Sequence, residues 1–375
     1  MPFKFNIARE DLLKAISDQQ SITNKKGTMA ILSNVLLEVD NDKVVITGTD
    51  LEIGLKQEVP AEVFEKGTLT LPSKKLFELA RESSSSTISF EEEENNWVKI
   101  EAGSSLYKLA GILSDEFPQF PDYDESKIIE IESDILASLI DKTIFSIAQD
   151  KENMFTLTAA LLQKNEQNGK NILRMVSSDG HRLSIMEKES DKAEGLQLNP
   201  VTLIPRRGIN EIRKFTEKSD EILFGIEENQ AVLKSDDSLL IIRLMEGEYP
   251  DIDNLLSAVS MDNSLKVNRL KFLESLKRIN LFTEDMFHVI QLEIKNNELI
   301  LNSQNADFGS AKDNLEIEYD GEPMTMSFNC RYFIETLQVM EGGLVEASIS
   351  SESSPCLITS EEDEGFLSII MPMKT

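Results

Sequence analysis

The feature that most constrains this 375-residue chain is a pattern that recurs three times, about 125 to 130 residues apart. Its first marker is a pair of predicted strands joined by a turn that carries an acid or an amide. The marker residues are Asp50, Asp179 and Asn305, which are 129 and 126 residues apart. Copies of this length are domains rather than solenoid units, because each can bury a core of its own.

Two further markers recur in step with the first. An apolar strand running into a short helix is predicted at Pro72, Pro205 and Asn329. The segments FPQFPDYD and EYPDID close the first two copies, and FLSIIMPMKT is the corresponding part of the third. We therefore predict three domains, residues 1–126, 127–252 and 253–375.

Each copy has the same predicted order of elements: an early amphipathic helix, alternating β segments, a second helix and more strands. Two helices on one face of an antiparallel sheet is the economical arrangement for this order. The predicted fold class is therefore α+β, with three tandem domains of that kind. The residues that follow helical spacing are Leu12 and Ile16 in the first copy and Leu136, Leu139, Ile140 and Ile147 in the second.

Charge is distributed unevenly along the chain. Acidic residues outnumber basic ones by 67 to 38, for a formal charge of −29. Segments 71–81, 203–218 and 265–278, which cover three of the six predicted helices, instead carry 13 basic and 4 acidic residues. Such helices could hold phosphates on one face of the assembly while the acidic remainder repels nucleic acid. From composition alone, an ordinary solvated helix face explains the bias equally well.

Composition also narrows the compartment and the chemistry. The 2 cysteines, Cys330 and Cys356, lack metal-site spacing, and the start MPFKFNIARED has no basic region followed by an apolar run. No stretch approaches the roughly 18 apolar residues of a membrane span. We predict a cytoplasmic protein without disulfides, bound metal or membrane contact.

Motifs for catalysis are missing from the sequence. The 2 histidines, His181 and His288, lie in different copies, and no HExxH, GxSxG, GxxxxGK[ST] or GxGxxG motif occurs. The segment VDNDKVV lacks the glycine and distal ligands of a calcium loop and is typical of a hairpin turn. Asp50, Asp179 and Asp307 belong to separate domains, which argues against a carboxylate cluster. We predict a binding protein with no enzymatic activity and no cofactor.

Four segments carry a family resemblance: GTDLEI at 48–53, SDGHRL at 178–183, EYPD at 248–251 and the terminal MPMKT. On these residues the chain resembles the bacterial sliding clamps, the β subunits of DNA polymerase III. The resemblance implies a homodimeric ring, of which one chain is half. It also implies that the ring encircles double-stranded DNA without sequence preference and that helices line its hole.

The resemblance further implies a pocket between the second and third domains that binds linear peptides. Its expected ligands are the DNA polymerase III α subunit, the clamp-loader δ subunit, other DNA polymerases, and mismatch-repair or ligase proteins. We expect flexible methionines to accept related peptides, and Arg182 with the Gly180 turn to meet their polar groups. The implied lining residues are Leu157, Ser178, Gly180, His181, Arg182, Leu183, Pro250, Leu255, Ile369, Met371, Pro372 and Met373.

Two other surfaces follow from the same resemblance. The implied DNA contacts are Lys26, Arg81, Gln149, Arg206, Arg207 and Lys214. The implied dimer seam pairs Tyr107 and Leu109 of the first domain with Leu281 and Phe282 of the third.

Three positions depart from the family pattern. Asn254 stands where a basic residue is common, Ser178 where threonine is common, and the chain ends in Lys374-Thr375 rather than a basic residue and leucine. Two other functions stay open from the residues alone. One is a repeat-built scaffold that binds acidic proteins with its basic helices, and the other is a metal-dependent nuclease that uses the acidic turns.

Overall fold

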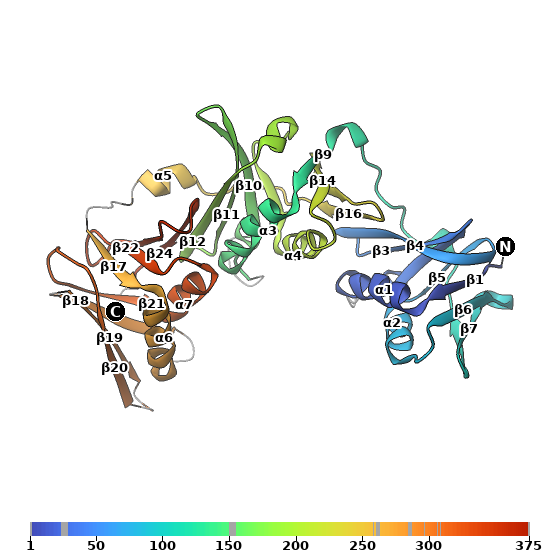
Figure 1. Cartoon of the computed structure of the whole chain (residues 1–375), viewed down its shortest axis with the longest axis horizontal. Coiled ribbons are helices and arrows are strands. Elements are labelled where there is room, and N and C mark those ends of the chain that lie inside the picture. Colours follow the sequence, from blue (N-terminus) through green and yellow to red (C-terminus); the bar gives the residue numbers. More distant parts are fainter. Residues whose placement is uncertain are drawn as a thin grey trace. The chain divides into compact units, whose positions relative to one another are not determined.

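The computed structural model describes residues 2–23, 29–149, 155–257, 259, 263–283, 287–295, 297–305, 307 and 309–373. Three successive segments share one order of elements, a strand, a helix, four strands, a helix and three strands (Figure 1). The first repeat holds β1 (Lys4–Ala8), α1 (Arg9–Thr23), β2 (Asn34–Asp40), β3 (Lys43–Thr49), β4 (Ile53–Glu65), β5 (Gly67–Pro72), α2 (Ser73–Glu82), β6 (Thr87–Glu92), β7 (Trp97–Ala102) and β8 (Ser105–Ala110).

The second and third repeats follow the same plan. The second holds β9 (Ile129–Glu132), α3 (Ser133–Asp141), β10 (Ala159–Gln167), β11 (Lys170–Ser178), β12 (Arg182–Glu189), β13 (Thr202–Pro205), α4 (Arg206–Phe215), β14 (Glu221–Glu227), β15 (Gln230–Lys234) and β16 (Ser238–Arg243). After the short α5 (Ile252–Ser257), the third holds β17 (Ser264–Asn268), α6 (Arg269–Ile279), β18 (Val289–Lys295), β19 (Glu298–Asn305), β20 (Gly309–Glu316), β21 (Met324–Asn329), α7 (Cys330–Val339), β22 (Leu344–Ser348), β23 (Cys356–Thr359) and β24 (Phe366–Ile370).

The chain divides into two compact units whose boundary runs through the second repeat. The first unit is residues 1–130 with 214–244, and the second is 131–213 with 245–375. A 12-stranded sheet follows the path β8-β7-β6-β1-β4-β16-β15-β14-β9, with β2, β3 and β5 branching from it. The second unit holds the eight strands β13-β10-β11-β12-β24-β23-β22-β17 and the four strands β20-β19-β18-β21. Each unit therefore contains one joint, which we define as a strand pair that links two repeats: β4 with β16, and β12 with β24.

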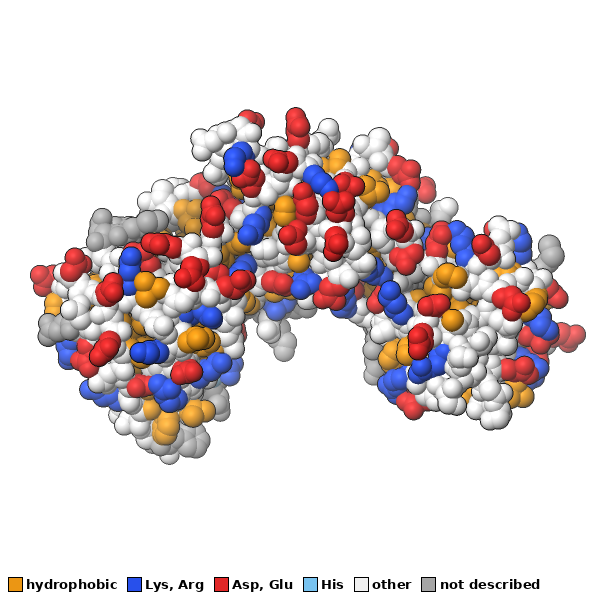
Figure 2. Space-filling model, in the orientation of Figure 1, with side chains coloured by type: hydrophobic (Ala, Val, Ile, Leu, Met, Phe, Trp, Pro, Cys, Tyr) orange, Lys and Arg blue, Asp and Glu red, His pale blue; other side chains and the backbone are white. Residues whose placement is uncertain are grey.

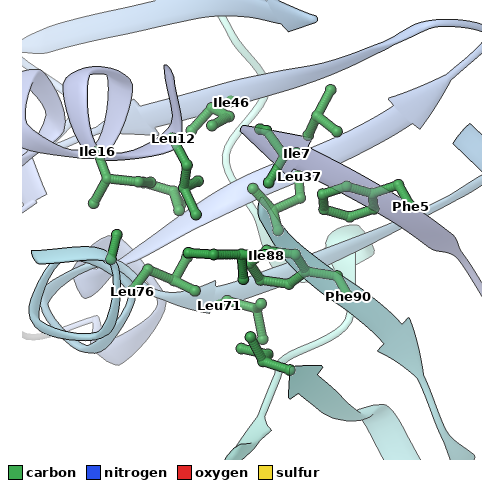
Figure 3. Close-up of a cluster of buried hydrophobic side chains, with 14 of the residues drawn as sticks. Phe5, Ile7, Leu12, Ile16, Leu37, Ile46, Leu71, Leu76, Ile88 and Phe90 are labelled. Atoms are coloured by element: carbon green, nitrogen blue, oxygen red, sulfur yellow. The ribbon is translucent and has the colours of Figure 1, made fainter. Parts of the chain in front are cut away.

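Paired helices cover the strands of the first and third repeats. In the first unit α1 and α2 lie side by side and pack on β2 to β5, and in the second unit α6 packs against α7 (Figure 1). The helices and the sheet of the first repeat meet in an apolar core, in which Leu12 and Ile16 of α1 face Leu71 and Leu76 (Figure 3). The expected helical spacing in α1 is therefore a buried face.

The second repeat differs from its prediction at one residue. Leu136, Leu139 and Ile140 are buried on α3, but the helix ends at Asp141. Ile147 follows a separate short 3-10 turn and is buried there instead. Thr143 donates its hydroxyl hydrogen to the Leu139 carbonyl, four residues back, which satisfies a carbonyl at the helix end.

The repeated acid or amide closes the same turn in each repeat. Asp50 accepts hydrogen bonds through Oδ1 from the backbone of Glu52 and Ile53. Asp179 accepts in the same way from the two backbone groups at the corresponding positions, and Asn305 accepts from Asp307. A side-chain oxygen that binds the backbone two residues ahead is the mechanism by which Asp and Asn stabilise turns. The residues of the first marker therefore stabilise turns, and they do not form a carboxylate cluster.

None of the described helices combines the length and apolar character needed to cross a bilayer.

Candidate functional site

The turn between β11 and β12 is tightly organised by its own side chains. The hydroxyl of Ser178 donates to the Arg182 carbonyl and accepts from the Gly180 N–H. Gly180 has φ of +85°, a left-handed conformation that glycine adopts without steric cost. Ser178 keeps the hydroxyl that this closure requires, so the departure from threonine leaves the turn intact.

The segment after β24 is anchored on both sides. Strands β12 and β24 pair with Leu183 opposite Ile369. The Met371 N–H donates to the His181 carbonyl at 2.9 Å, and the Met373 N–H donates to the Ser327 carbonyl at 2.8 Å. Met371 is 44% exposed although its backbone is held. Its side chain is therefore presented to solvent from a fixed position.

An apolar cluster underlies this segment and joins the second and third repeats. Leu183 and Ile369 are buried in it, and Tyr249 and Leu256 pack against it while partly exposed. Leu255 is 49% exposed, and Leu157 is buried beside Gly180. Among the predicted pocket residues, Leu183 and Ile369 belong to this cluster, which we call the floor, whereas Met371 and Leu255 are exposed. Of the remaining three residues, Pro250 is exposed, and Pro372 and Met373 are half-buried.

The EYPD segment positions α5. Asp251 accepts a hydrogen bond from the Asn254 N–H, as a residue before a helix does when it caps the first turn. Asp253 on this helix forms an ion pair with the buried Arg174 at 3.0 Å. Burial raises the pKa of the Tyr249 phenol. Asn254 therefore lies on the first turn of α5, one residue before Leu255.

Arg182 makes contacts inside the protein that were not predicted. Its side chain is 8% exposed and bonds to Asp179 at 3.0 Å and to the Phe145 carbonyl at 2.7 Å, and it also pairs with Glu335 on α7. The guanidinium also lies over the ring of Tyr332, 4.6 Å from its centroid. These contacts fasten the turn to the third repeat, and the contact of Arg182 with the polar groups of a peptide stays a prediction.

Sequence reasoning missed the α7 residues in this arrangement. Tyr332 and Glu335 are three residues apart on one helix, and the His181 ring stacks on Tyr332 with centroids 6.5 Å apart. The helical spacing of an aromatic and an acid was visible in the sequence. Nothing in the sequence indicated that both would face residue 182.

The predicted DNA contacts lie on or near helices, in different states of exposure. Arg81 is exposed, pairs with Glu82 and lies over the Phe77 ring. Gln149 and Lys214 are exposed, whereas Arg206 and Arg207 are half-buried. Arg206 donates to the Ile147 carbonyl at 2.6 Å, which holds the segment before Gln149 against α4. Lys26 lies outside the described residues.

Several basic residues of the three biased segments serve the fold itself. Lys218 pairs with Asp18, Arg213 with Asp141 and Arg278 with Asp313. Arg269 donates to the carbonyl of Leu337 in α7 and to that of Gly342 beyond its end. The face drawn in Figure 2 shows acidic side chains spread widely with basic ones between them. Part of the helical basic bias is therefore structural.

The predicted seam residues lie at two sheet edges. β8 ends the first sheet and carries Tyr107 and Leu109, which are half-buried against the first core. β20 ends the four-stranded sheet, and the 3-10 turn that follows α6 carries Leu281, which is 77% exposed, and Phe282.

Metal and thiol chemistry find little support in the structure. Among the described residues, no group of three or more His, Cys, Asp or Glu side chains is arranged to hold a metal ion. Cys330 and Cys356 are free and buried, and burial raises the pKa of the Cys330 thiol to about 12. A thiol protonated at neutral pH is a poor nucleophile and a poor metal ligand.

Comparison with known proteins identifies the family. Three models of the DNA polymerase III beta subunit match in order: its N-terminal domain at residues 3–121, its central domain at 130–251 and its C-terminal domain at 260–374. The beta sliding clamp of Chlamydia pneumoniae is 28% identical over 373 residues and covers 99% of both chains. That of Bacillus subtilis is 26% identical over 384 residues, which covers 99% of this chain and 100% of the relative.

Solved structures agree with the family models. The C. crescentus beta sliding clamp superposes with a TM-score of 0.93 at 26% identity, and a Pseudomonas aeruginosa DNA polymerase sliding clamp with 0.91 at 26%; both comparisons cover 100% of each chain. The chain therefore belongs to the DNA polymerase III beta subunit family: it is a sliding clamp, a non-enzymatic processivity factor of DNA replication whose partners are DNA and a DNA polymerase.

Proposed function

We propose that two copies of this chain close head to tail into a ring around duplex DNA, and that the ring tethers its protein partners through the apolar site at Met371 and Leu255. The observation that carries the ring is the position of β8 and β20. Both end a sheet, and their equivalents in the other repeats form the two joints. An exposed edge strand is a template for pairing with another chain.

Equivalent residues on the first strand of each joint can be found from the turn marker, through the strand that precedes it. Three residues on this preceding strand each lie three positions before the marker residue of their repeat: Thr47, Val176 and Asn302. Their partners in the next strand of the sheet are Lys56 in β4, Ile185 in β12 and Lys312 in β20. Lys312 is therefore the β20 residue that corresponds to Lys56 and Ile185.

The second strand of each joint is aligned by a backbone contact further along the chain. Ile112 and Met245 form isolated bridges with Thr70 and Leu203, and Met373 binds Ser327. These three partners each lie two residues before the second marker. The leucines six residues before the bridging residues are therefore equivalent to one another: Leu106, Leu239 and Leu367.

Both existing joints use the same register. Lys56 lies opposite Leu239, and Ile185 opposite Leu367. By this rule Lys312 of one copy pairs with Leu106 of the other. Both side chains are exposed, and the next pair along, Ala311 with Tyr107, is half-buried on both strands. A slip of one residue would place inward residues opposite outward ones, so burial supports the same register.

The peptide site is proposed on the residues around Met371. Its floor is apolar, its turn is locked by Asp179 and Arg182, and Met371 and Leu255 remain accessible. Methionine side chains adapt to ligands of different shape. The finer partners that we propose are the DNA polymerase III α subunit, the clamp-loader δ subunit, other DNA polymerases, and mismatch-repair or ligase proteins. Each would bind through a short linear peptide in the cytoplasm.

The DNA contacts that we propose are loose. Arg81, Gln149, Arg206, Arg207 and Lys214 would meet phosphates without reading bases, because a ring that slides is retained by topology rather than by affinity. Phosphate contacts carry no sequence information and weaken with salt. Encirclement is tested by retention of the loaded protein on circular DNA and its loss from linear DNA, and equal loss from both would overturn it.

A cross-link tests the ring and its register together. We expect Leu106→Cys combined with Lys312→Cys to form an intermolecular disulfide under mild oxidation, because both side chains leave the seam on the same face. Tyr107→Cys with Lys312→Cys is the matched control, since those side chains face opposite sides. Cys330 and Cys356 are buried and should not compete. Sedimentation as a 42.2 kDa monomer at micromolar concentration would contradict the ring.

Peptide titration tests the second site. We expect Met371→Ala and Leu255→Ala each to weaken binding of a polymerase-derived peptide about tenfold or more, because each removes exposed apolar area from the contact. Phe64→Ala is the control, since Phe64 is 54% exposed on β4 of the first repeat. Equal affinity of all three variants would show that the peptide binds elsewhere.

A further inference from the structure

A polar group lies at the first joint, on the side where the helices pack. Asp18 of α1 accepts from Gln57 of β4 at 2.9 Å and from Lys218, in the second repeat, at 2.8 Å. Lys218 also donates to Ser238 of β16, which lies directly opposite Gln57 in the joint. We call these four residues the first node. Its acid comes from one repeat and its base from the next.

The second joint carries a node at the same place. Lys142 donates to Asp363 at 2.7 Å and to the Val339 carbonyl at 2.5 Å, and it lies over the Phe366 ring. Phe366 of β24 lies opposite Met186 of β12, as Ser238 lies opposite Gln57. The ion pair again spans two repeats, but here the base belongs to the earlier repeat and the acid to the later one.

The equivalent positions in the third repeat are Arg278 and Asp313. Asp18, Lys142 and Arg278 each lie nine residues after the first residue of their helix: Arg9, Ser133 and Arg269. Asp313 follows Lys312 as Gln57 follows Lys56 and Met186 follows Ile185. Arg278 bonds to Asp313 through Nη2 at 2.6 Å and through Nε at 3.0 Å, and Ser275 donates to the same carboxylate.

The third position differs from the other two in where its charges lie. Both the base and the acid belong to one repeat and pair with each other. Across the proposed seam, the equivalent of Ser238 is Ser105, at the start of β8. The equivalent of Lys218, thirteen residues after the proline, is Ser85 within the serine run 83–86 that follows α2. The facing side at these positions is therefore uncharged.

We propose that Ser105 and the serine run 83–86 of a second copy pack over the Arg278–Asp313 pair as a third node. Both charges of this pair belong to one copy, so two copies can separate at the seam without dividing an ion pair. The seam between copies is therefore the joint at which the ring separates. The inference rests on the proposed homodimer. Separating the first or second node would divide an ion pair and leave each charge without its partner. The cost is greatest for the buried Lys142–Asp363 pair and smaller for the more exposed Lys218–Asp18 pair, whereas the third node separates with its charges still matched.

The test moves one carboxylate across the seam. In Asp313→Ser combined with Ser105→Asp, the acid would face Arg278 from the other copy, which recreates the arrangement of the first two joints. We expect the dimer dissociation constant to be on the order of tenfold lower than that of Asp313→Ser alone, as close charge pairs at interfaces give. We also expect the double variant to lose this advantage as salt is raised.

Controls separate the failure of this inference from that of the ring. Asp313→Ser with Ser104→Asp carries the same charge one residue away in the β7–β8 turn and should gain little. Ser105→Asp with Asp313 intact should weaken the dimer, because two carboxylates then meet. If the unmodified protein forms a dimer but positions 104 and 105 behave alike, the third node is wrong. If the unmodified protein is a monomer, the proposed ring fails instead.

Discussion

The two joints within the chain occupy equivalent strands, but they differ in the direction and burial of their ion pairs. In the first, the Lys218 and Asp18 side chains are 16% and 32% exposed. In the second, the Lys142 and Asp363 side chains are 9% and 1% exposed, and Asp363 also accepts from the backbone of Glu341 and Gly342. Both joints thus carry an ion pair at this place, but its direction and its energetic weight differ between them. Burial sets the weight, because solvent screens the first pair more than the second.

The largest effect is expected from Asp363→Ala. The change leaves Lys142 buried without its carboxylate and removes the acceptor of two backbone N–H groups. Loss of one partner of a buried pair costs about 3 to 5 kcal/mol. Urea denaturation followed by fluorescence or circular dichroism measures the loss. Glu341→Ala is the control, because Glu341 is 86% exposed and 3.4 Å from the same lysine; equal losses would refute the burial argument.

Arg182→Ala is expected to have the next largest effect, about 2 to 3 kcal/mol, since it breaks charge-assisted bonds that link the turn to α7. The same change should weaken peptide binding through the position of the turn. Glu335→Gln distinguishes positioning from direct contact. If Arg182 acts by holding the turn to α7, calorimetric titration should show weaker peptide binding for Glu335→Gln as well. An unchanged affinity would favour a direct role for Arg182.

At the first joint, Asp18→Ala should cost only about 1 kcal/mol, near the upper end for exposed pairs. The partners of Asp18 remain partly satisfied, because Lys218 keeps Ser238. Thermal unfolding in parallel with Asp363→Ala gives the contrast directly. A loss as large as that of Asp363→Ala would show that both joints carry equal weight.

Mild acid should have the smallest effect. Burial raises the pKa of Asp363, but the Lys142 ammonium and the backbone N–H groups outweigh it and hold this pKa below its ordinary 3.8. A carboxyl group with a lowered folded pKa stabilises above its unfolded pKa, and that stability is lost as pH falls through the folded pKa. At pH 4 the loss is at most about 0.3 kcal/mol, because that is the limit for a group whose unfolded pKa is near 3.8. Asp363→Asn should lack this component, so the two stability–pH curves should converge as pH falls below 4.

Much of the fold was predictable because it is encoded locally. The turn markers Asp50 and Asp179 act within three residues of themselves, so their recurrence in the sequence already located the hairpins. The prediction of an α+β clamp fold is confirmed, as are the family and the absence of enzymatic activity. The domain boundaries at 126 and 252 and the assignment of site residues stay predictions.

Arg182 and the basic helices show where sequence reasoning stopped. Arg182 was predicted to line the peptide pocket, but its partner Glu335 lies 153 residues away and was not predicted. Lys218 and Arg278 were counted toward a DNA-facing surface, yet Lys218 is paired at the first joint and Arg278 beside the edge strand β20. Local spacing predicts which face of a helix a charge occupies, and it does not predict what packs against that face.

The sequence by itself determined the threefold repeat, the turn chemistry and the order of helices and strands, because each depends on contacts within a few residues. Only the tertiary structure decided how charges are matched across the joints. Lys142 and Asp363 are 221 residues apart, and their bond exists because β12 and β24 pair in one register. The equivalent helix position is an acid at one joint and a base at the other, so it pairs with a residue of opposite charge in each case. The pairing of distant strands therefore makes the two joints differ although the repeats share one fold.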